Sequence, residues 1–106
     1  MRRSFAIALS IAALSGSAAA ETAKPDPGEC AAAAEVTLHD WQGRLAKART
    51  ADDAEVARQQ IARAEAVRRV TGDPVTPPAL HRKYTDLPPD LRDMFVVRCA
   101  IKLGAI

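Results

Sequence analysis

Residues 89–103, PDLRDMFVVRCAIKL, decide the fold because they form the most apolar segment outside the N-terminus of the chain. The leading proline suits the first turn of a helix, and Gly104 follows where a helix end favours glycine. Arg98 and Lys102, spaced i to i+4, favour a helix over the strand that two adjacent valines would also suit. The apolar residues cover most sides: Leu91, Met94, Phe95, Val96, Val97, Cys99, Ala100, Ile101 and Leu103. We therefore expect the central helix of a small all-α bundle.

Three further helices are predicted upstream of this segment. Residues 30–48 carry apolar side chains three and four positions apart, which indicates one helical face. A second helix is expected to begin after Thr50 as its N-cap and to end at the Gly-Asp-Pro sequence of residues 72–74. A short third helix is expected over residues 77–84, with Thr76 as its cap. The pattern predicts a three- to four-helix bundle.

Residues 1–20 have the features of a cleavable signal peptide. Arg2 and Arg3 form a basic start, an apolar stretch covers residues 5–14, and three alanines precede Glu21. The apolar stretch is about ten residues long, half of the roughly twenty that a membrane-spanning helix needs. We expect cleavage before Glu21, a periplasmic or secreted location and no stable membrane insertion afterwards. A retained anchor and the twin-arginine export route are the alternatives.

Two cysteines, Cys30 and Cys99, remain after cleavage. An even number of cysteines in an oxidising compartment predicts a disulfide, and here only one pairing exists. Such a bond would join the first and last helices of a domain too small to be stable on a large core alone. We expect residues 21–29 to be a flexible leader and residues 30–106 to form a single domain.

The formal charge of +2 belongs to the signal peptide. Arg2 and Arg3 are two of the fifteen basic residues, so residues 21–106 carry thirteen bases and thirteen acids. This balance argues against a net-basic nucleic-acid-binding protein. The charge is uneven, since residues 21–40 are net acidic and residues 41–72 net basic, which favours an antiparallel helix pair with complementary faces.

Residues 21–106 offer few groups for catalysis. All four serines lie within residues 1–20, the cysteines are expected to pair, and the scattered glycines form no phosphate-binding loop. Asp86, Asp90 and Asp93 surround the start of the last helix, where acids are favoured by the helix dipole rather than by acid–base chemistry. We therefore predict that the protein is not an enzyme.

Two histidines, His39 and His81, could in principle bind a metal or a cofactor. His39 with Glu35 and Asp40 would supply part of a zinc site, and either histidine with Met94 would supply the axial ligands of a haem. No characteristic zinc-binding spacing is present, and a lone methionine on an apolar face usually fills a core. We expect a surface cluster with no metal and no cofactor.

Five residues are candidates for binding a partner. The only tryptophan lies on the apolar face of the first helix, where packing between helices is the first interpretation and a binding hot spot the second. The other candidates belong to the short third helix or to the last helix, whose apolar surface a small domain does not fully cover. The set is Trp41, Tyr84, Phe95, Val96 and Val97. The leading hypothesis is a non-enzymatic accessory or inhibitory subunit that binds another periplasmic protein or a second copy of itself.

A stress chaperone is the alternative function. In export, size, helical content and a single disulfide, the chain resembles the small acid-activated periplasmic chaperones of enteric bacteria. Because residues 21–106 carry thirteen acids and thirteen bases, protonation of the carboxylates near pH 3 would leave a strongly cationic chain that loosens and exposes apolar surface. A small cofactor-binding protein is the third hypothesis.

Overall fold

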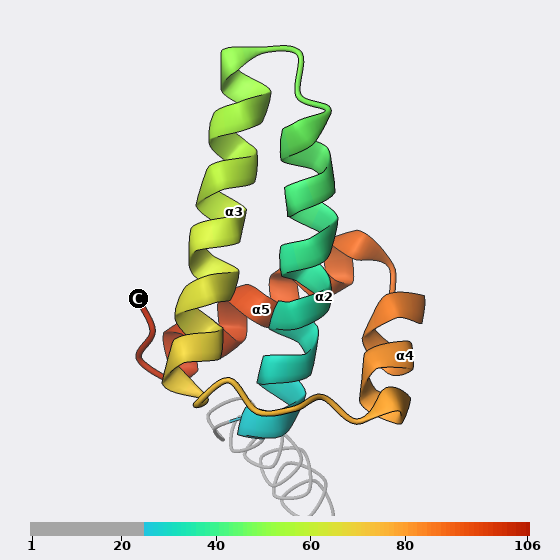
Figure 1. The fold of residues 1–106 in the computed structure, drawn as a ribbon. Coiled ribbons are helices and arrows are strands. Elements are labelled where there is room, and N and C mark those ends of the chain that lie inside the picture. Colours follow the sequence, from blue (N-terminus) through green and yellow to red (C-terminus); the bar gives the residue numbers. More distant parts are fainter. Residues whose placement is uncertain (1–24) are drawn as a thin grey trace, which may run out of the picture.

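The computed structural model describes residues 25–106, which form four α-helices and no strand (Figure 1). The helices are α2 (Pro27–Ala46), α3 (Ala51–Val70), α4 (Pro78–Asp86) and α5 (Pro89–Lys102). The predicted signal peptide, residues 1–20, lies outside the described residues. The expected all-α bundle of three to four helices is confirmed, with four helices in the described residues.

The two long helices form an antiparallel hairpin to which the two shorter helices attach near one end. α2 and α3 run side by side, α5 crosses behind both, and α4 packs beside α2 (Figure 1). The other half of the hairpin extends beyond α5. The antiparallel pair predicted from the charge distribution is therefore present.

The disulfide between Cys30 and Cys99 joins α2 to α5. The two Cα atoms lie 5.8 Å apart, within the range that a disulfide spans without backbone distortion. Both cysteines are fully buried. The predicted covalent link between the first and last helices is confirmed.

Small side chains form the centre of the core. Residues 31–34 are four consecutive alanines of α2, all fully buried, and Ala64 of α3 and Ala100 of α5 face them from the neighbouring helices. Helices approach one another closely where the side chains between them are small. Val67 and Val96 fill the remaining space, so α3 and α5 pack tightly on the disulfide-bearing end of α2.

The helix ends follow local capping chemistry. α2 begins at Pro27, three residues before its predicted start, because the Asp26 carboxylate accepts a hydrogen bond from the amide of Gly28 at 2.7 Å. α3 begins after Thr50 as predicted, and the Thr50 hydroxyl accepts a hydrogen bond from the Asp53 amide at 3.0 Å. Gly104, with φ of 71°, follows the end of α5 in the left-handed conformation that favours glycine.

The predicted cap of α4 is wrong. Pro77, not Thr76, occupies the N-cap position, and α4 begins at Pro78 without a side-chain capping bond. A residue before proline is held in an extended conformation, so Thr76 before Pro77 and Pro77 before Pro78 both stay outside the helix, which begins at Pro78. The Thr76 hydroxyl is instead buried and without a hydrogen-bond partner within residues 25–106.

We expect Thr50→Ala to lower the free energy of unfolding by about 1 kcal/mol, because the substitution removes the capping bond of α3. Thr76→Val is the matched control, since it replaces an unpartnered buried hydroxyl with a methyl group and should preserve or raise stability. Urea denaturation followed by circular dichroism measures both. Equal losses in the two variants would contradict the assignment of the caps.

Candidate functional site

Two of the five candidate binding residues lie in the core. Tyr84 is 3 % exposed and Val96 is 1 % exposed, so neither can contact a partner in this conformation. Val96 shares the inward face of α5 with Cys99, and the disulfide turns that face toward α2. The structure therefore removes Tyr84 and Val96 from the candidate surface.

Phe95 and Tyr84 together hold α4 in place. Their rings stack with centroids 5.4 Å apart, which packs α4 against the half-buried Phe95 of α5. The Tyr84 hydroxyl donates a hydrogen bond to Glu29 of α2 at 2.8 Å, and Lys83 pairs with the same carboxylate at 2.9 Å. These aromatic residues serve packing between helices.

Trp41 joins α2 to α5. Its indole Nε1 donates a hydrogen bond to the Asp93 carboxylate at 3.1 Å, and the Arg44 guanidinium lies 4.4 Å from the ring centroid. The ring is half-buried. The first interpretation of Trp41, packing between helices, fits this geometry, and Asp93 accepts from an indole rather than serving as a helix cap.

The exposed side of α5 carries a continuous apolar stripe. Leu91 is 52 %, Met94 66 % and Ile101 60 % exposed, and the half-buried Val97 lies between them. These residues recur at spacings of three and four, so they share one helix face. We call this surface, which also includes Arg98 and Lys102, the α5 outer face.

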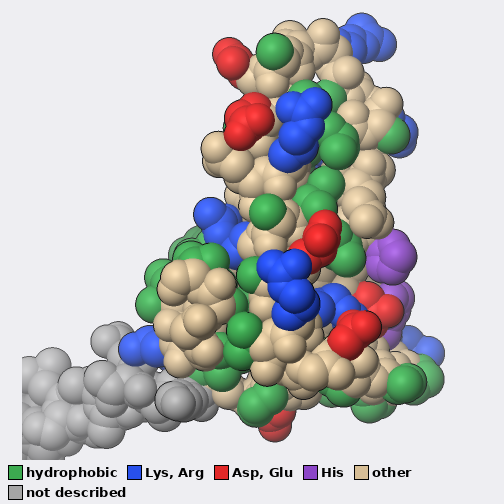
Figure 2. Space-filling model, turned by 60° about the vertical axis from the view of Figure 1, so that its left-hand side comes forward, with side chains coloured by type: hydrophobic (Ala, Val, Ile, Leu, Met, Phe, Trp, Pro, Cys, Tyr) green, Lys and Arg blue, Asp and Glu red, His purple; other side chains and the backbone are tan. Residues whose placement is uncertain are grey.

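The α5 outer face is shallow, apolar and bordered by cations. A hollow in it is lined by Met94, Val97, Arg98, Ile101 and Lys102. Figure 2 shows hydrophobic side chains gathered on the side of the molecule where α5 lies. Of the predicted candidates only Val97 belongs to this surface, and three larger apolar residues around it were missed.

The histidines lie in a separate groove between α2 and α4. His39 and Asp40 of α2, His81 of α4 and Arg92 of α5 line it. Met94 lies on the outer face of α5, apart from the groove that both histidines line. Within residues 25–106, no three His, Cys, Asp or Glu side chains gather closely enough to hold a metal ion.

Arg92 is the most deeply buried charged residue of this groove. Its guanidinium donates hydrogen bonds to the Tyr84 carbonyl and to the Asp40 carboxylate, each at 3.1 Å. The Arg92 side chain is 5 % exposed, whereas that of Asp40 is 30 % exposed and also pairs with Arg44 at 3.3 Å. A buried cation therefore depends on a carboxylate at the edge of the groove.

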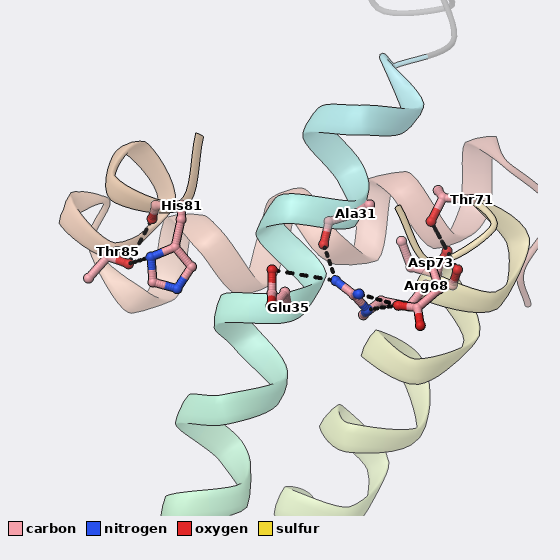
Figure 3. Close-up of polar contacts among 8 residues, drawn as sticks. Ala31, Glu35, Arg68, Thr71, Asp73, His81 and Thr85 are labelled. Carbon is pink, nitrogen blue, oxygen red and sulfur yellow. Dashed lines mark hydrogen bonds and ion pairs between the residues drawn. The ribbon is translucent and has the colours of Figure 1, made fainter. Parts of the chain in front are cut away.

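Four carboxylates mediate five side-chain contacts of α2 with other helices. Figure 3 shows one of them, in which Arg68 of α3 reaches toward Glu35 of α2 (3.6 Å) and donates to the Ala31 carbonyl. Another pairs Glu29 with Lys83. The set is Glu29–Lys83, Glu29–Tyr84, Glu35–Arg68, Asp40–Arg92 and Trp41–Asp93. Each of these contacts loses its charged oxygen when the carboxylate is protonated.

The pKa of Glu29 lies below its ordinary value of 4.5, because hydrogen bonds from Lys83 and then from Tyr84 stabilise the carboxylate. The pKa of Tyr84 is raised in turn by burial and by its bond to Glu29. A carboxyl group whose pKa is lowered by folding stabilises the folded state when the pH is above the pKa of the unfolded chain. This stabilisation is lost as the pH falls through the lowered pKa of the folded state.

We expect α4 to be the first helix to detach in acid because Glu29 holds it on α2. Glu29→Gln should lower the protection of α4 amides against hydrogen exchange already at neutral pH. The protection of α4 in this variant should then depend less on pH between pH 5 and pH 3 than in the wild type. Glu55→Gln, an exposed site on α3, is the matched control and should leave α4 unchanged. Equal pH dependence in the two variants would contradict the role of Glu29.

The chain matches no protein-family model, no curated protein sequence and no solved structure at a significant level. None of the helices within residues 25–106 is long and apolar enough to cross a membrane. The interpretation of the site therefore depends on its own geometry.

Proposed function

We propose that the protein is an exported, non-enzymatic protein that binds a protein partner, either another exported protein or a second copy of itself, through the α5 outer face. The exposure of Leu91, Met94 and Ile101 on one side of a single helix carries this proposal. Contiguous apolar surface on a small domain marks interaction sites, and each large side chain that leaves water contributes about 1.5–3 kcal/mol. The disulfide fixes α5 on α2, so the surface is already in its binding conformation before contact.

The remaining features of the chain support the same proposal. Residues 21–106 contain no serine, and both cysteines are used in the disulfide. Export through residues 1–20 agrees with a disulfide, which persists in oxidising compartments. An accessory or inhibitory subunit of a periplasmic or secreted protein has these properties.

Site-specific photo-crosslinking in the producing cells tests the proposal. We expect a photoreactive residue at Met94 to yield a protein adduct of defined mass, and an Ile101→Asp substitution in the same chain to abolish it. The matched control places the photoreactive residue at Val75, which is 94 % exposed but lies outside the α5 outer face. Absence of an adduct at Met94, or the same adduct at Val75, would refute the proposal.

An acid-activated chaperone is the second candidate function, and the carboxylates between the helices favour it. Low pH would neutralise the four carboxylates that link α2 to the other helices, three on α2 and one on α5. The disulfide would still hold α2 and α5 together. The loosened chain would expose additional apolar surface. Light scattering of an aggregating client at pH 3 and at pH 7 tests this function, and equal aggregation with and without the protein at pH 3 would exclude it.

A further inference from the structure

We propose that the α5 outer face pairs with the α5 outer face of a second copy of this chain, with the two helices antiparallel. This inference rests on the proposed function, since it names the partner of the same surface. The argument combines the position of the apolar stripe along α5 with the unpaired charges at its two ends.

The stripe is suited to two-fold pairing. It extends from Leu91 to Ile101, a length of about 15 Å at 1.5 Å per residue. A two-fold axis at the middle of this stripe, near position 96, places Leu91 of each copy beside Ile101 of the other and brings the Met94 side chains close to the axis. Such an interface uses the same patch twice, as closed dimers do.

The charges of α5 are arranged in the order that antiparallel pairing requires. Asp90 lies in the first turn, whereas Arg98 and Lys102 lie toward the end of the helix. Antiparallel pairing brings the acidic end of each copy to the basic end of the other, and the two helix dipoles then oppose one another favourably. Within residues 25–106, the structure gives none of these three charges an ion-pair partner.

The same charges disfavour other occupants. An anionic membrane surface would attract Arg98 and Lys102 but repel Asp90 at the opposite end of the stripe. A foreign helix would need its own apolar stripe with acidic and basic ends in reversed order. A second copy supplies both features, and residues 21–106 carry no net charge that would keep copies apart.

Sedimentation equilibrium of the protein, produced with its own signal and purified after export, tests the pairing. We expect a concentration-dependent monomer–dimer equilibrium that Ile101→Glu weakens about a hundredfold, because the substitution buries a carboxylate against Leu91 and next to Asp90 of the other copy on each side of the interface. Val75→Glu introduces the same charge at an exposed apolar site outside the surface and should leave the equilibrium unchanged.

Charge reversal tests the antiparallel orientation. Asp90→Lys and Lys102→Glu should each weaken self-association roughly tenfold, since each places like charges at both ends of the pair. A mixture of the two variants should restore association, because Lys at position 90 then faces Glu at position 102. Failure of the mixture to associate would overturn the antiparallel pairing.

The results separate this inference from the proposed function. A monomeric wild-type protein that still gives an adduct with a different protein at Met94 would overturn the second copy as partner and leave protein binding intact. Absence of both dimer and adduct would overturn both. Flotation with vesicles of mixed phosphatidylcholine and phosphatidylglycerol, abolished by Met94→Glu, would reassign the α5 outer face to a membrane surface and overturn the pairing.

Discussion

Paired Cys30→Ala and Cys99→Ala substitutions are expected to lower the free energy of unfolding by about 4 kcal/mol, the largest effect of any change considered. The bond closes a loop of 69 positions, and removing it restores the conformational freedom of the unfolded chain. A small domain has a total stability of about 5–10 kcal/mol, so much of the stability disappears. Urea denaturation of purified wild-type and variant proteins, followed by circular dichroism, measures the difference.

Reduction of the wild-type protein provides the matched control. It breaks the same bond without changing the sequence, and both cysteines are fully buried, so the reductant acts only after the chain opens. Reduced wild type and the double alanine variant should therefore show similar stability once reduction is complete. A loss below about 1 kcal/mol in both would contradict a stabilising role of the disulfide.

The second large loss of stability is expected when the ion pair of Asp40 with Arg92 is broken, and its size depends on which of the two residues is replaced. Asp40→Ala should cost about 3 kcal/mol because it leaves the buried Arg92 without a counter-charge. Arg92→Met should cost less, about 2 kcal/mol, because a methionine fills the buried space and Asp40 retains water and Arg44. Chemical denaturation of both variants gives the two values.

Two further variants complete this test. The double variant Asp40→Ala with Arg92→Met should be more stable than the sum of the single losses predicts, because the uncompensated charge disappears. Arg44→Ala removes the exposed partner of Asp40 and the cation over the Trp41 ring, and it should cost no more than about 1 kcal/mol. Additive losses, or a larger loss for Arg44→Ala than for Asp40→Ala, would contradict the assigned role of Arg92.

The helices were predictable where their ends depend on nearby residues. Thr50 caps α3 through the amide three positions away, and Gly104 follows α5 in the conformation expected of glycine. The disulfide was predictable because only two cysteines remain after cleavage, so no choice of partners exists. Thr76 failed as a cap because the two prolines after it shift the helix start, a competition between local signals.

The candidate surface was predicted only in part, because apolar residues cover most sides of α5. Val96 and Val97 are adjacent in the sequence, but one lies in the core and the other on the outer face. The signal that separates them was present: Cys99 must face inward to reach Cys30, and this sets the rotation of the helix. From that rotation Met94 and Ile101 fall on the opposite face.

The burial of Arg92 and Tyr84 carried no such local signal. Arginine is rarely buried, and its position here depends on the Asp40 carboxylate and the Tyr84 carbonyl, which come from two other helices. Tyr84 is buried because α4 packs on α2 through Glu29. Both contacts depend on how the helices pack, which the spacing of residues within one helix does not specify.

The link between Cys30 and Cys99 also determines what a protease can do to this molecule. It encloses the connections between all four helices, among them the stretch around Arg49 between α2 and α3. A single cut at any peptide bond between the two cysteines leaves both fragments attached to one another, so a nicked chain stays one molecule. Helix α5, with its outer face, would then remain linked to α2 even after the loop at the far end of the hairpin has been cut.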